Sequence, residues 1–383
     1  MLPALLQGQP DLRRRWDIPR ARNRASVTTT DVRSGETMNV EQKIPFVAAD
    51  GLACNLIHVT GETRATKGPI LLVHGAGVRA NIFRPPVRTT FVDFLIANGY
   101  DVWLENWRAS IDLPRNEWTL DQAALYDHPA AVRKVQEETG AQTLKAVIHC
   151  QGSTSFMMSA VAGLIPQVTT ILSNAVSLHP IIPWISHQKI RYAVPAVGLL
   201  TPYLNPQWGE EAHGFVPRLL KALVTLTHHE CDNGVCRFSS FTYGTGFPVL
   251  WRHENLDPAV HDWIRHEFAD VPLTFFRQMG RCLDAGHLVR YERLADLPDD
   301  FTARPPRTNA RFIFIAGELN QCFRWQSQQA TFDWFEQHRP NYHALHVLGG
   351  YGHLDIFIGV NAARDVFPVL LAELDRPEGA RLS

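Results

Sequence analysis

The feature that most constrains the fold is a repeated alternation of short apolar runs with segments of helical length. The apolar runs are ILLVH, YDVWLENW, LKAVIHC and VTTILSNAV, and helix-length segments lie between them at 91–98, at 119–139 and after residue 150. The first two of these segments end at Gly99 and Gly140, as helices often do. Continuous apolar runs of this length are typical of parallel strands that are covered on both faces. The alternation therefore predicts an α/β fold, a mostly parallel sheet with helices on both sides.

The same rhythm divides the chain into segments. Residues 1–39 are Arg-rich and show no clear periodicity, and we expect an N-terminal arm there. Two alternating segments between 40 and 58, separated by a turn at Asp50-Gly51, predict a β-hairpin that enters the sheet. The rhythm stops between 179 and 305, a stretch rich in Pro, Trp and His, and resumes with the strands ARFIFIAGELN and HALHVL and with helices near 327–338 and 362–374. We expect a core at 40–178 and 306–383, with 179–305 inserted as a cap over the carboxyl edge of the sheet.

Composition narrows the class of function. The chain has 383 residues and a net charge of -1, which gives no reason to expect a nucleic-acid or anionic-membrane partner. It lacks an apolar run of about 18 residues, so we expect no membrane span. The charges near the N-terminus follow a very short apolar run, the wrong order for a secretory signal, and this favours a cytoplasmic protein.

Six cysteines are scattered along the chain, which predicts reduced thiols rather than a disulfide framework. Cys231 and Cys236 follow His228 and His229 in HHECDNGVC, but this spacing matches no common zinc site. We therefore expect neither a metal nor a cofactor, and the role of the two thiols stays open.

The strongest chemical signal is LKAVIHCQGSTSF, a strand that runs directly into a helix through a tight turn with Cys150 at its apex. In such a turn the apex side chain projects above the sheet, and the first N–H groups of the helix point toward the same space. A thiol at a helix N-terminus is expected to have a pKa below its usual value of about 8.5. From this stretch alone, a reactive cysteine and a simply buried one fit equally well.

Two more segments supply partners for such a thiol. In VHGAG, the backbone N–H of Ala76 is expected beside the apex residue, where with the N–H of Gln151 it would form an oxyanion hole. In GGYGHLDIFIG, His353 follows the last predicted strand and comes after the nucleophile in the chain, as the base does in folds of this kind.

The third catalytic member is the least certain assignment. In GELNQCF, after the strand RFIFIA, the position expected to hold an acid is occupied by Asn320. Glu318, two residues earlier, and Asp355, after the histidine, are the alternative acids. A thiol depends less on a carboxylate than a hydroxyl does, and Cys-His-Asn is an established combination in papain-like proteases. The cysteine and the amide therefore agree chemically, and we favour Asn320.

Together these segments resemble a known family. The HG(A)G loop, GYDVWLENWRAS, TGAQTLKAVIHCQGS and YGHLDIFIG resemble the acid lipase family of α/β-hydrolases, over roughly 45–375. They are closer still to bacterial α/β-hydrolase domains found alone or fused to cholesterol-oxidase-like flavoproteins. The resemblance implies an α/β-hydrolase fold with a helical cap, Cys150 as nucleophile, His353 as base and a third member in the Asn320 loop. It also suggests a flavoprotein oxidoreductase as partner. The chain departs from the acid lipases at Cys150 (serine there), Asn320 (aspartate) and Ile148 (glycine), and Ile148 predicts a slightly different packing of the turn.

These observations predict a cysteine-dependent acyl-transfer enzyme, most simply a hydrolase of a hydrophobic ester, lactone or thioester that passes through an acyl-cysteine. Two alternatives remain open, an acyltransferase with an acceptor other than water and a binding protein that keeps the fold with weakened chemistry. Aromatic residues in the cap suggest a hydrophobic acyl or polycyclic substrate, unless they only pack against the core: Trp184, Tyr192, Tyr203, Trp208 and Phe215. The sequence leaves the substrate, the acceptor and the oligomeric state undetermined.

Overall fold

A nine-stranded sheet forms the centre of the molecule in the computed structural model, which describes residues 15–16 and 39–377. The strand order is β1-β11-β10-β7-β6-β4-β5-β3-β2. The first seven strands in this order, β1 through β5, pair in parallel with their neighbours. The last two, β3 and β2, form an antiparallel hairpin that joins the sheet through antiparallel pairing of β3 with β5. The predicted mostly parallel sheet and the hairpin are both present. The strands are β1 (Arg15–Trp16), β2 (Val40–Val47), β3 (Ala53–Thr60), β4 (Pro69–Val73), β5 (Asp101–Asn106), β6 (Leu144–His149), β7 (Val168–Asn174), β10 (Arg311–Gly317) and β11 (Ala344–Leu348).

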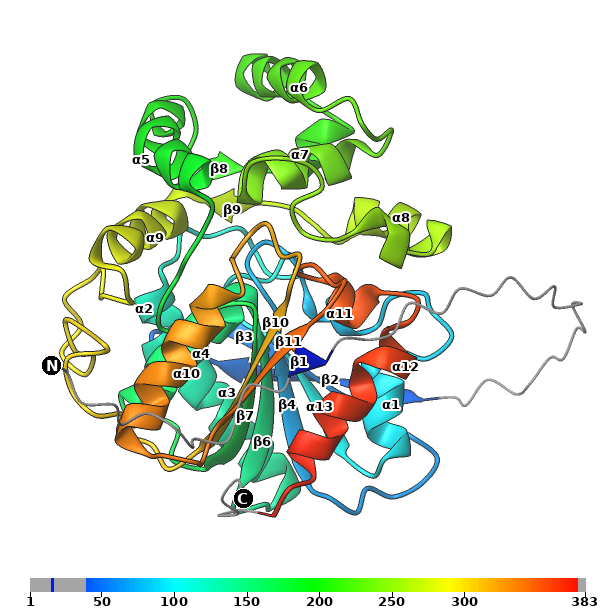
Figure 1. Ribbon diagram of the computed structural model, residues 1–383, viewed down its shortest axis with the longest axis vertical. Coiled ribbons are helices and arrows are strands. Elements are labelled where there is room, and N and C mark those ends of the chain that lie inside the picture. The colour runs from blue at the N-terminus through cyan, green and yellow to red at the C-terminus, as the bar shows by residue number, and fades with distance from the viewer. Residues whose placement is uncertain (1–14, 17–38, 378–383) are drawn as a thin grey trace, which may run out of the picture.

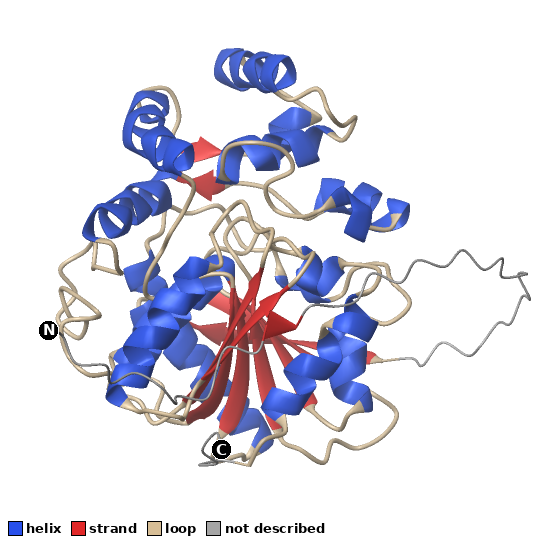
Figure 2. Cartoon of the chain, viewed as in Figure 1, coloured by secondary structure: helices blue, strands red, loops and turns tan. Residues whose placement is uncertain are grey.

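Helices cover both faces of this sheet (Figures 1 and 2). The central strands β4 and β10 are buried at every position, because side chains from both faces meet helices, and this explains their uninterrupted apolar sequences. The helix predicted at 119–139 is present as α2, the π-turn η2 and α3, and it ends at Gly140 in the left-handed conformation. The core helices are η1 (Ala80–Phe83), α1 (Phe91–Ala97), α2 (Leu120–Gln122), η2 (Ala123–Asp127), α3 (His128–Thr139), α4 (Cys150–Val161), α10 (Gln326–His338), α11 (Asp355–Ile358), α12 (Ala362–Asp365) and α13 (Phe367–Leu374).

A second layer lies over one end of the sheet (Figure 1). It comes from the chain between β7 and β10, where the sequence loses its strand–helix rhythm, and it consists of helices around a two-stranded antiparallel pair. Its elements are α5 (Trp184–Gly198), β8 (Tyr203–Leu204), η3 (Pro206–Gly209), α6 (Phe215–Thr227), α7 (Gly234–Tyr243), η4 (His253–Asn255), α8 (Pro258–Trp263), η5 (Ile264–His266), β9 (Val271–Pro272) and α9 (Leu273–Ala285). We call this layer the cap. Most of the predicted N-terminal arm lies outside the described residues.

Within the described part of the chain, every helix is too short or too polar to cross a bilayer.

A buried ion pair ties the hairpin to the core. The guanidinium of Arg108 donates to both carboxylate oxygens of Asp127 at 2.6–3.0 Å, and the backbone N–H of Arg108 donates to the same carboxylate at 2.9 Å. Arg108 also reaches Asp50, at the turn between β2 and β3, at 2.9 Å. Asp127 and Arg108 are almost fully buried. Removing one partner would leave an uncompensated charge in a poorly solvated place.

We expect Asp127→Asn to lower the free energy of unfolding by about 3 kcal/mol, because it leaves the buried Arg108 guanidinium without its main counter-charge. Urea denaturation followed by circular dichroism measures this change. Glu138→Gln is the matched control, since the pair of Glu138 with Lys134 lies on the surface of α3 and is weakened by solvent screening. Equal losses in the two variants would contradict this account of the Arg108 pair.

Candidate active site

Cys150 lies at the junction of β6 and α4 with a φ of +56°. A non-glycine residue with positive φ is strained, and strain of this kind is a property of the nucleophile turn in which a strand passes directly into a helix. Two glycines make room for this turn. A Cβ on Gly152 would lie 2.2 Å from the carbonyl oxygen of His74, and one on Gly75 would lie 2.9 Å from Cβ of Cys150. Ile148 is fully buried within β6.

The backbone N–H groups of Ala76 and Gln151 face the thiol of Cys150, and both act to lower its pKa. They come from the loop after β4 and from the first turn of α4, and these are the groups that the sequence nominates for an oxyanion hole. The peptide that follows Ala76 is held in place by the cap, because the hydroxyl of Tyr243, at the end of α7, donates to the carbonyl oxygen of Ala76 at 2.9 Å. Tyr243 was missed by the sequence interpretation, and no local motif marks it.

His353 and Asn320 meet above the carboxyl ends of β11 and β10. Nδ2 of Asn320 lies 3.1 Å from Nδ1 of His353. Asp355, one of the alternative acids, instead accepts from the backbone N–H of Gly352 at 2.8 Å and from the Asn255 side chain at 2.6 Å. Glu318 is half-buried, and its backbone N–H donates to the carbonyl of Leu348. The structure thus places Asn320 against the imidazole ring.

The orientation of the Asn320 amide determines where the proton of His353 sits. Its Oδ1 accepts two backbone N–H groups, from Cys322 at 2.9 Å and Phe323 at 3.0 Å. Turning the amide over would point its NH₂ group at these two donors, so the NH₂ group must face the ring. An NH₂ group only donates, and Nδ1 of His353 must therefore accept. The proton of the neutral imidazole is then on Nε2.

This differs from the papain-like arrangement that the sequence suggests, in which the amide accepts from the ring. With its proton on Nε2, the imidazole has no lone pair available there to take a proton from a nucleophile. The histidine also has the wrong tautomer when the aspartate of a serine protease triad is changed to asparagine. That change leaves the geometry intact and lowers kcat by about 10⁴-fold.

Burial sets the charges of the site. It raises the pKa of Cys150 to about 12, although the N–H groups of Gln151 and Ala76 act in the opposite direction. Burial also lowers the pKa of His353 to about 3. The expected lowering of the thiol pKa is therefore wrong, because desolvation of the thiolate outweighs the favourable effect of the helix N-terminus. The site is at rest as a neutral thiol beside a neutral imidazole.

His149 brings a second imidazole close to the thiol. Ring nitrogens of His149 and His353 and Sγ of Cys150 all lie within 4.8 Å of one another. The Nδ2 group of Asn174 donates both to Nδ1 of His149 at 2.9 Å and to the carbonyl of His353 at 3.3 Å. Burial lowers the pKa of His149 well below its usual value, so this ring is neutral as well.

A pocket opens above Cys150, between the cap and the core. Its walls are mainly apolar, and the ammonium of Lys189, which donates to the carbonyl oxygens of Phe241 and Gly244, is an exception. Burial lowers the pKa of Lys189 to about 7. The aromatic residues that line the pocket are Phe241, Tyr243, Phe275, Phe276 and Phe323.

The cap aromatics suggested by the sequence as substrate contacts do not line this pocket. Trp184, Tyr192 and Phe215 are exposed, at 71%, 65% and 79%. Tyr203 lies under the guanidinium of Arg115, and Trp208 packs edge-on against Phe238. That part of the prediction is wrong, because composition shows that a segment is aromatic without showing which rings face inward.

Comparisons with known proteins fit this geometry. No family model matches the chain. Over 91% of its length it superimposes on the crystal structure of a soluble variant of monoglyceride lipase from Saccharomyces cerevisiae in complex with a substrate analogue, with a TM-score of 0.56, 14% identity and 98% of that chain covered. The chain has the α/β-hydrolase fold. A thermophilic esterase from Thermogutta terrifontis matches with a TM-score of 0.51 and 13% identity, over 88% of this chain and 98% of that one.

The sequence of this α/β-hydrolase-fold protein is similar to lipases and esterases, but the matched segments are shorter than the structural matches. It is 30% identical to sterol esterase 2 of Saccharomyces cerevisiae over 131 residues, 30% of this chain and 24% of that one. It is 29% identical to human gastric triacylglycerol lipase over 145 residues, 31% of this chain and 36% of that one. The chain thus spans about a quarter to a third of the length of these curated relatives. The cysteine nucleophile and the flavoprotein partner stay predictions.

The pKa of Cys150 predicts how its reactivity depends on pH. A thiol with a raised pKa gains thiolate as the pH rises toward that value, so alkylation by iodoacetamide should quicken by about tenfold per pH unit between pH 7 and 10 without a plateau. Quenched samples analysed by peptide mass spectrometry measure the rate at Cys150 separately from the other five cysteines. Rapid labelling at pH 6 that does not change with pH would show instead a thiolate held by an imidazolium.

The amide orientation predicts a gain of function. In Asn320→Asp a carboxylate oxygen would accept from Nδ1–H of His353, which moves the lone pair to Nε2. We expect the ester hydrolysis rate at pH 7 to rise by about a hundredfold or more, in line with the effect of the reverse change in serine proteases.

Asn320→Ala is the control for this variant, since it removes the NH₂ donor without adding an acceptor. The Asp variant should exceed both the Ala variant and the unmodified protein. If the Asp and Ala variants hydrolysed esters equally fast, the tautomer of His353 would not be what limits the rate.

Proposed function

We propose that the protein is a cysteine-dependent acyl-transfer enzyme that hydrolyses esters, lactones or thioesters with an apolar acyl group through an acyl-cysteine at Cys150. The observation that carries this proposal is the convergence of two backbone N–H groups, from Ala76 and Gln151, on the sulfur of a strained turn residue. Donors placed there stabilise the oxyanion that forms when the sulfur attacks a carbonyl carbon. The apolar pocket above the sulfur supplies room for the acyl group.

The relatives support an ester of a fatty or polycyclic compound. The sterol esterase and the gastric triacylglycerol lipase are named for such substrates. The pocket walls, with rings from both cap and core, are chemically suited to hydrocarbon.

The reaction proceeds in two halves. The thiol of Cys150 loses its proton, its sulfur bonds to the carbonyl carbon, and the resulting oxyanion is held by the N–H groups of Ala76 and Gln151. The bond to the leaving oxygen or sulfur then breaks, and the leaving group departs with a proton. In the second half, water attacks the acyl-cysteine, the acid is released and the thiol is regenerated.

The Asn320 amide makes the first proton transfer slow. His353 accepts the thiol proton at Nε2 only when its own proton is on Nδ1, and this requires Asn320 to present Oδ1 to the ring. That rotation gives up the hydrogen bonds from Cys322 and Phe323, each worth about 0.5–1.5 kcal/mol, and sets an NH₂ group against two N–H donors. We therefore propose slow turnover at neutral pH that increases toward alkaline pH, because thiolate then forms without the imidazole.

The same observation favours a second candidate, a binding protein that keeps the fold and the pocket with weakened chemistry. Such a protein would bind hydrophobic esters without forming a covalent adduct. An acyltransferase differs from both by giving the acyl group to an added alcohol or amine.

Acyl-cysteine formation tests the proposal. Intact-mass measurement after incubation with p-nitrophenyl esters of short and long acyl chains, a lactone and an acyl thioester should show one acyl adduct per chain in the unmodified protein at pH 9. Cys150→Ala should lose the adduct and the turnover, and Cys150→Ser should lose most of the turnover, because a serine hydroxyl needs the base that Asn320 disables. Cys54→Ala is the matched control, since Cys54 is a buried thiol in β3 outside the pocket.

Full turnover in Cys150→Ala would rule out the covalent route. Ester binding without any adduct between pH 6 and 10 would identify the binding protein. Transfer of the acyl group to added alcohol, with little free acid, would identify the acyltransferase.

A further inference from the structure

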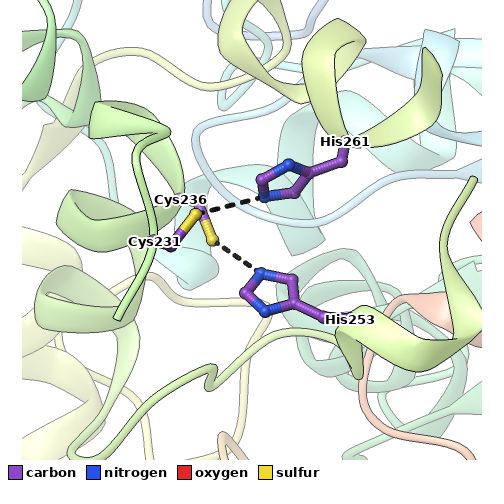
Figure 3. Close-up of side chains that lie close together, drawn as sticks. All are labelled: Cys231, Cys236, His253 and His261. Carbon is purple, nitrogen blue, oxygen red and sulfur yellow. Dashed lines mark hydrogen bonds between the residues drawn. The ribbon is translucent and has the colours of Figure 1, made fainter. Parts of the chain in front are cut away.

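Four potential metal ligands from separate elements converge in the cap. Figure 3 shows Cys231 and Cys236 side by side, with the rings of His253 and His261 directed at their sulfur atoms. Cys231 precedes α7, Cys236 lies in its first turn, His253 begins η4 and His261 lies in α8. Sγ of Cys231 is 3.4 Å from Nε2 of His261, and Sγ of Cys236 is 3.4 Å from Nε2 of His253. The ligand atoms of all four side chains lie within 4.8 Å of one another.

These distances fit a tetrahedral zinc ion. Zinc holds sulfur at about 2.3 Å and nitrogen at about 2.0–2.1 Å, so neighbouring ligand atoms of a tetrahedral site lie about 3.3–3.8 Å apart. Both measured sulfur–nitrogen distances fall within this interval. Two thiolates and two neutral imidazoles also balance the charge of a divalent ion, which suits a place where Cys236 is buried and the other three ligands are half-buried. We propose that Cys231, Cys236, His253 and His261 bind a structural zinc ion.

Asn233, the N-cap residue of α7, orients three of these four ligands. Its backbone N–H donates to Sγ of Cys231 at 3.4 Å, and its Oδ1 accepts from the backbone N–H of Cys236 at 2.9 Å. Its Nδ2 donates to the carbonyl of His261 at 2.6 Å. Supporting contacts of this kind hold ligands in place before the metal arrives.

The sequence did not predict this group of four ligands, because its two histidines are distant from the cysteines along the chain. In the sequence the neighbours of the cysteines are His228 and His229, and that spacing matches no common zinc site. The residues that complete the cluster come 17 and 25 positions after Cys236. Only the tertiary fold of the cap brings them to the thiols.

The zinc ion would lock the part of the cap that contacts the catalytic loops. From the N-terminal turn that holds Cys236, α7 runs to Tyr243, which donates to the carbonyl of Ala76 beside the oxyanion hole. From His253, η4 runs to Asn255, which donates to Asp355 at 2.6 Å and to the carbonyl of Gly350 at 2.9 Å, in the loop of His353. The ion would thus fix the positions of Tyr243 and Asn255, the two residues that contact the catalytic loops, without taking part in the reaction.

Metal analysis of the full chain, purified without chelator and without a histidine tag, tests the proposal. Inductively coupled plasma mass spectrometry should find one zinc per chain, and Cys231→Ser/Cys236→Ser should lose it. His229→Ala is a matched control, because His229 is an exposed histidine next to the cluster in sequence, and it should keep the metal. Cys150→Ser should also keep it, which separates the cap cluster from His149, Cys150 and His353, the other grouping of potential ligands among the described residues.

Cobalt substitution of the unmodified protein gives a readout that does not depend on how any variant folds. The unmodified protein loaded with Co²⁺ should show the intense visible bands of a tetrahedral ion and sulfur-to-cobalt charge-transfer bands, and His261→Gln should weaken or shift them. Chelator treatment of the zinc protein should lower its thermal midpoint by several degrees, and added zinc should restore it.

Three results would overturn the proposal. The first is that the unmodified protein binds no zinc after dialysis against an equimolar zinc salt. The second is that the double cysteine variant retains zinc and Cys150→Ser loses it. A disulfide between Cys231 and Cys236 in protein purified under argon, seen as a loss of two mass units, would show that the thiols pair with each other instead.

Discussion

The left-handed backbone of Cys150 is the constraint on which the rest of the site depends. β6 passes into α4 without a connecting loop, and this turn is possible only because Gly75 and Gly152 leave space around it. The strain is stabilised by a helix that is buried along its whole length and by parallel pairing of β6 with β4 and β7. In return, the turn presents the sulfur to two backbone N–H groups and to the pocket.

The thiol and the two imidazole rings beside this strained turn are uncharged at rest. Burial raises the pKa of Cys150 and lowers that of His353, and the amides of Asn320 and Asn174 both offer NH₂ groups to imidazole nitrogens. A carboxylate at residue 320 would reverse the polarity at the ring and make it a base. The chain therefore combines the α/β-hydrolase fold with a resting electrostatic state that opposes fast proton transfer. Thiol chemistry tolerates this state better than serine chemistry does, because a thiolate forms in water more readily than an alkoxide.

The cap does more than close the pocket. Through Tyr243 it holds the peptide that follows Ala76, and through Asn255 it holds the loop of His353. Both contacts originate in elements that meet at the cluster of Cys231, Cys236, His253 and His261. A metal ion is a cross-link that reduced thiols can form, and it would make this part of the cap more rigid.

The sequence by itself determined the α/β fold, the hairpin and the turn at Cys150, because buried parallel strands and the glycines beside a strained turn leave local patterns. It also nominated Ala76, Gln151, His353 and Asn320, since each follows a strand at the same edge of the sheet. The tertiary structure decided what depends on partners distant in the chain. It showed that desolvation outweighs the helix N-terminus at the thiol, and that the backbone N–H groups of Cys322 and Phe323 turn the Asn320 amide toward the ring with its donor side. It likewise showed which aromatic rings face the pocket and which histidines meet the cap thiols. Burial, amide orientation and ligand geometry are set by three-dimensional packing, so the spacing of residues in the sequence does not predict them.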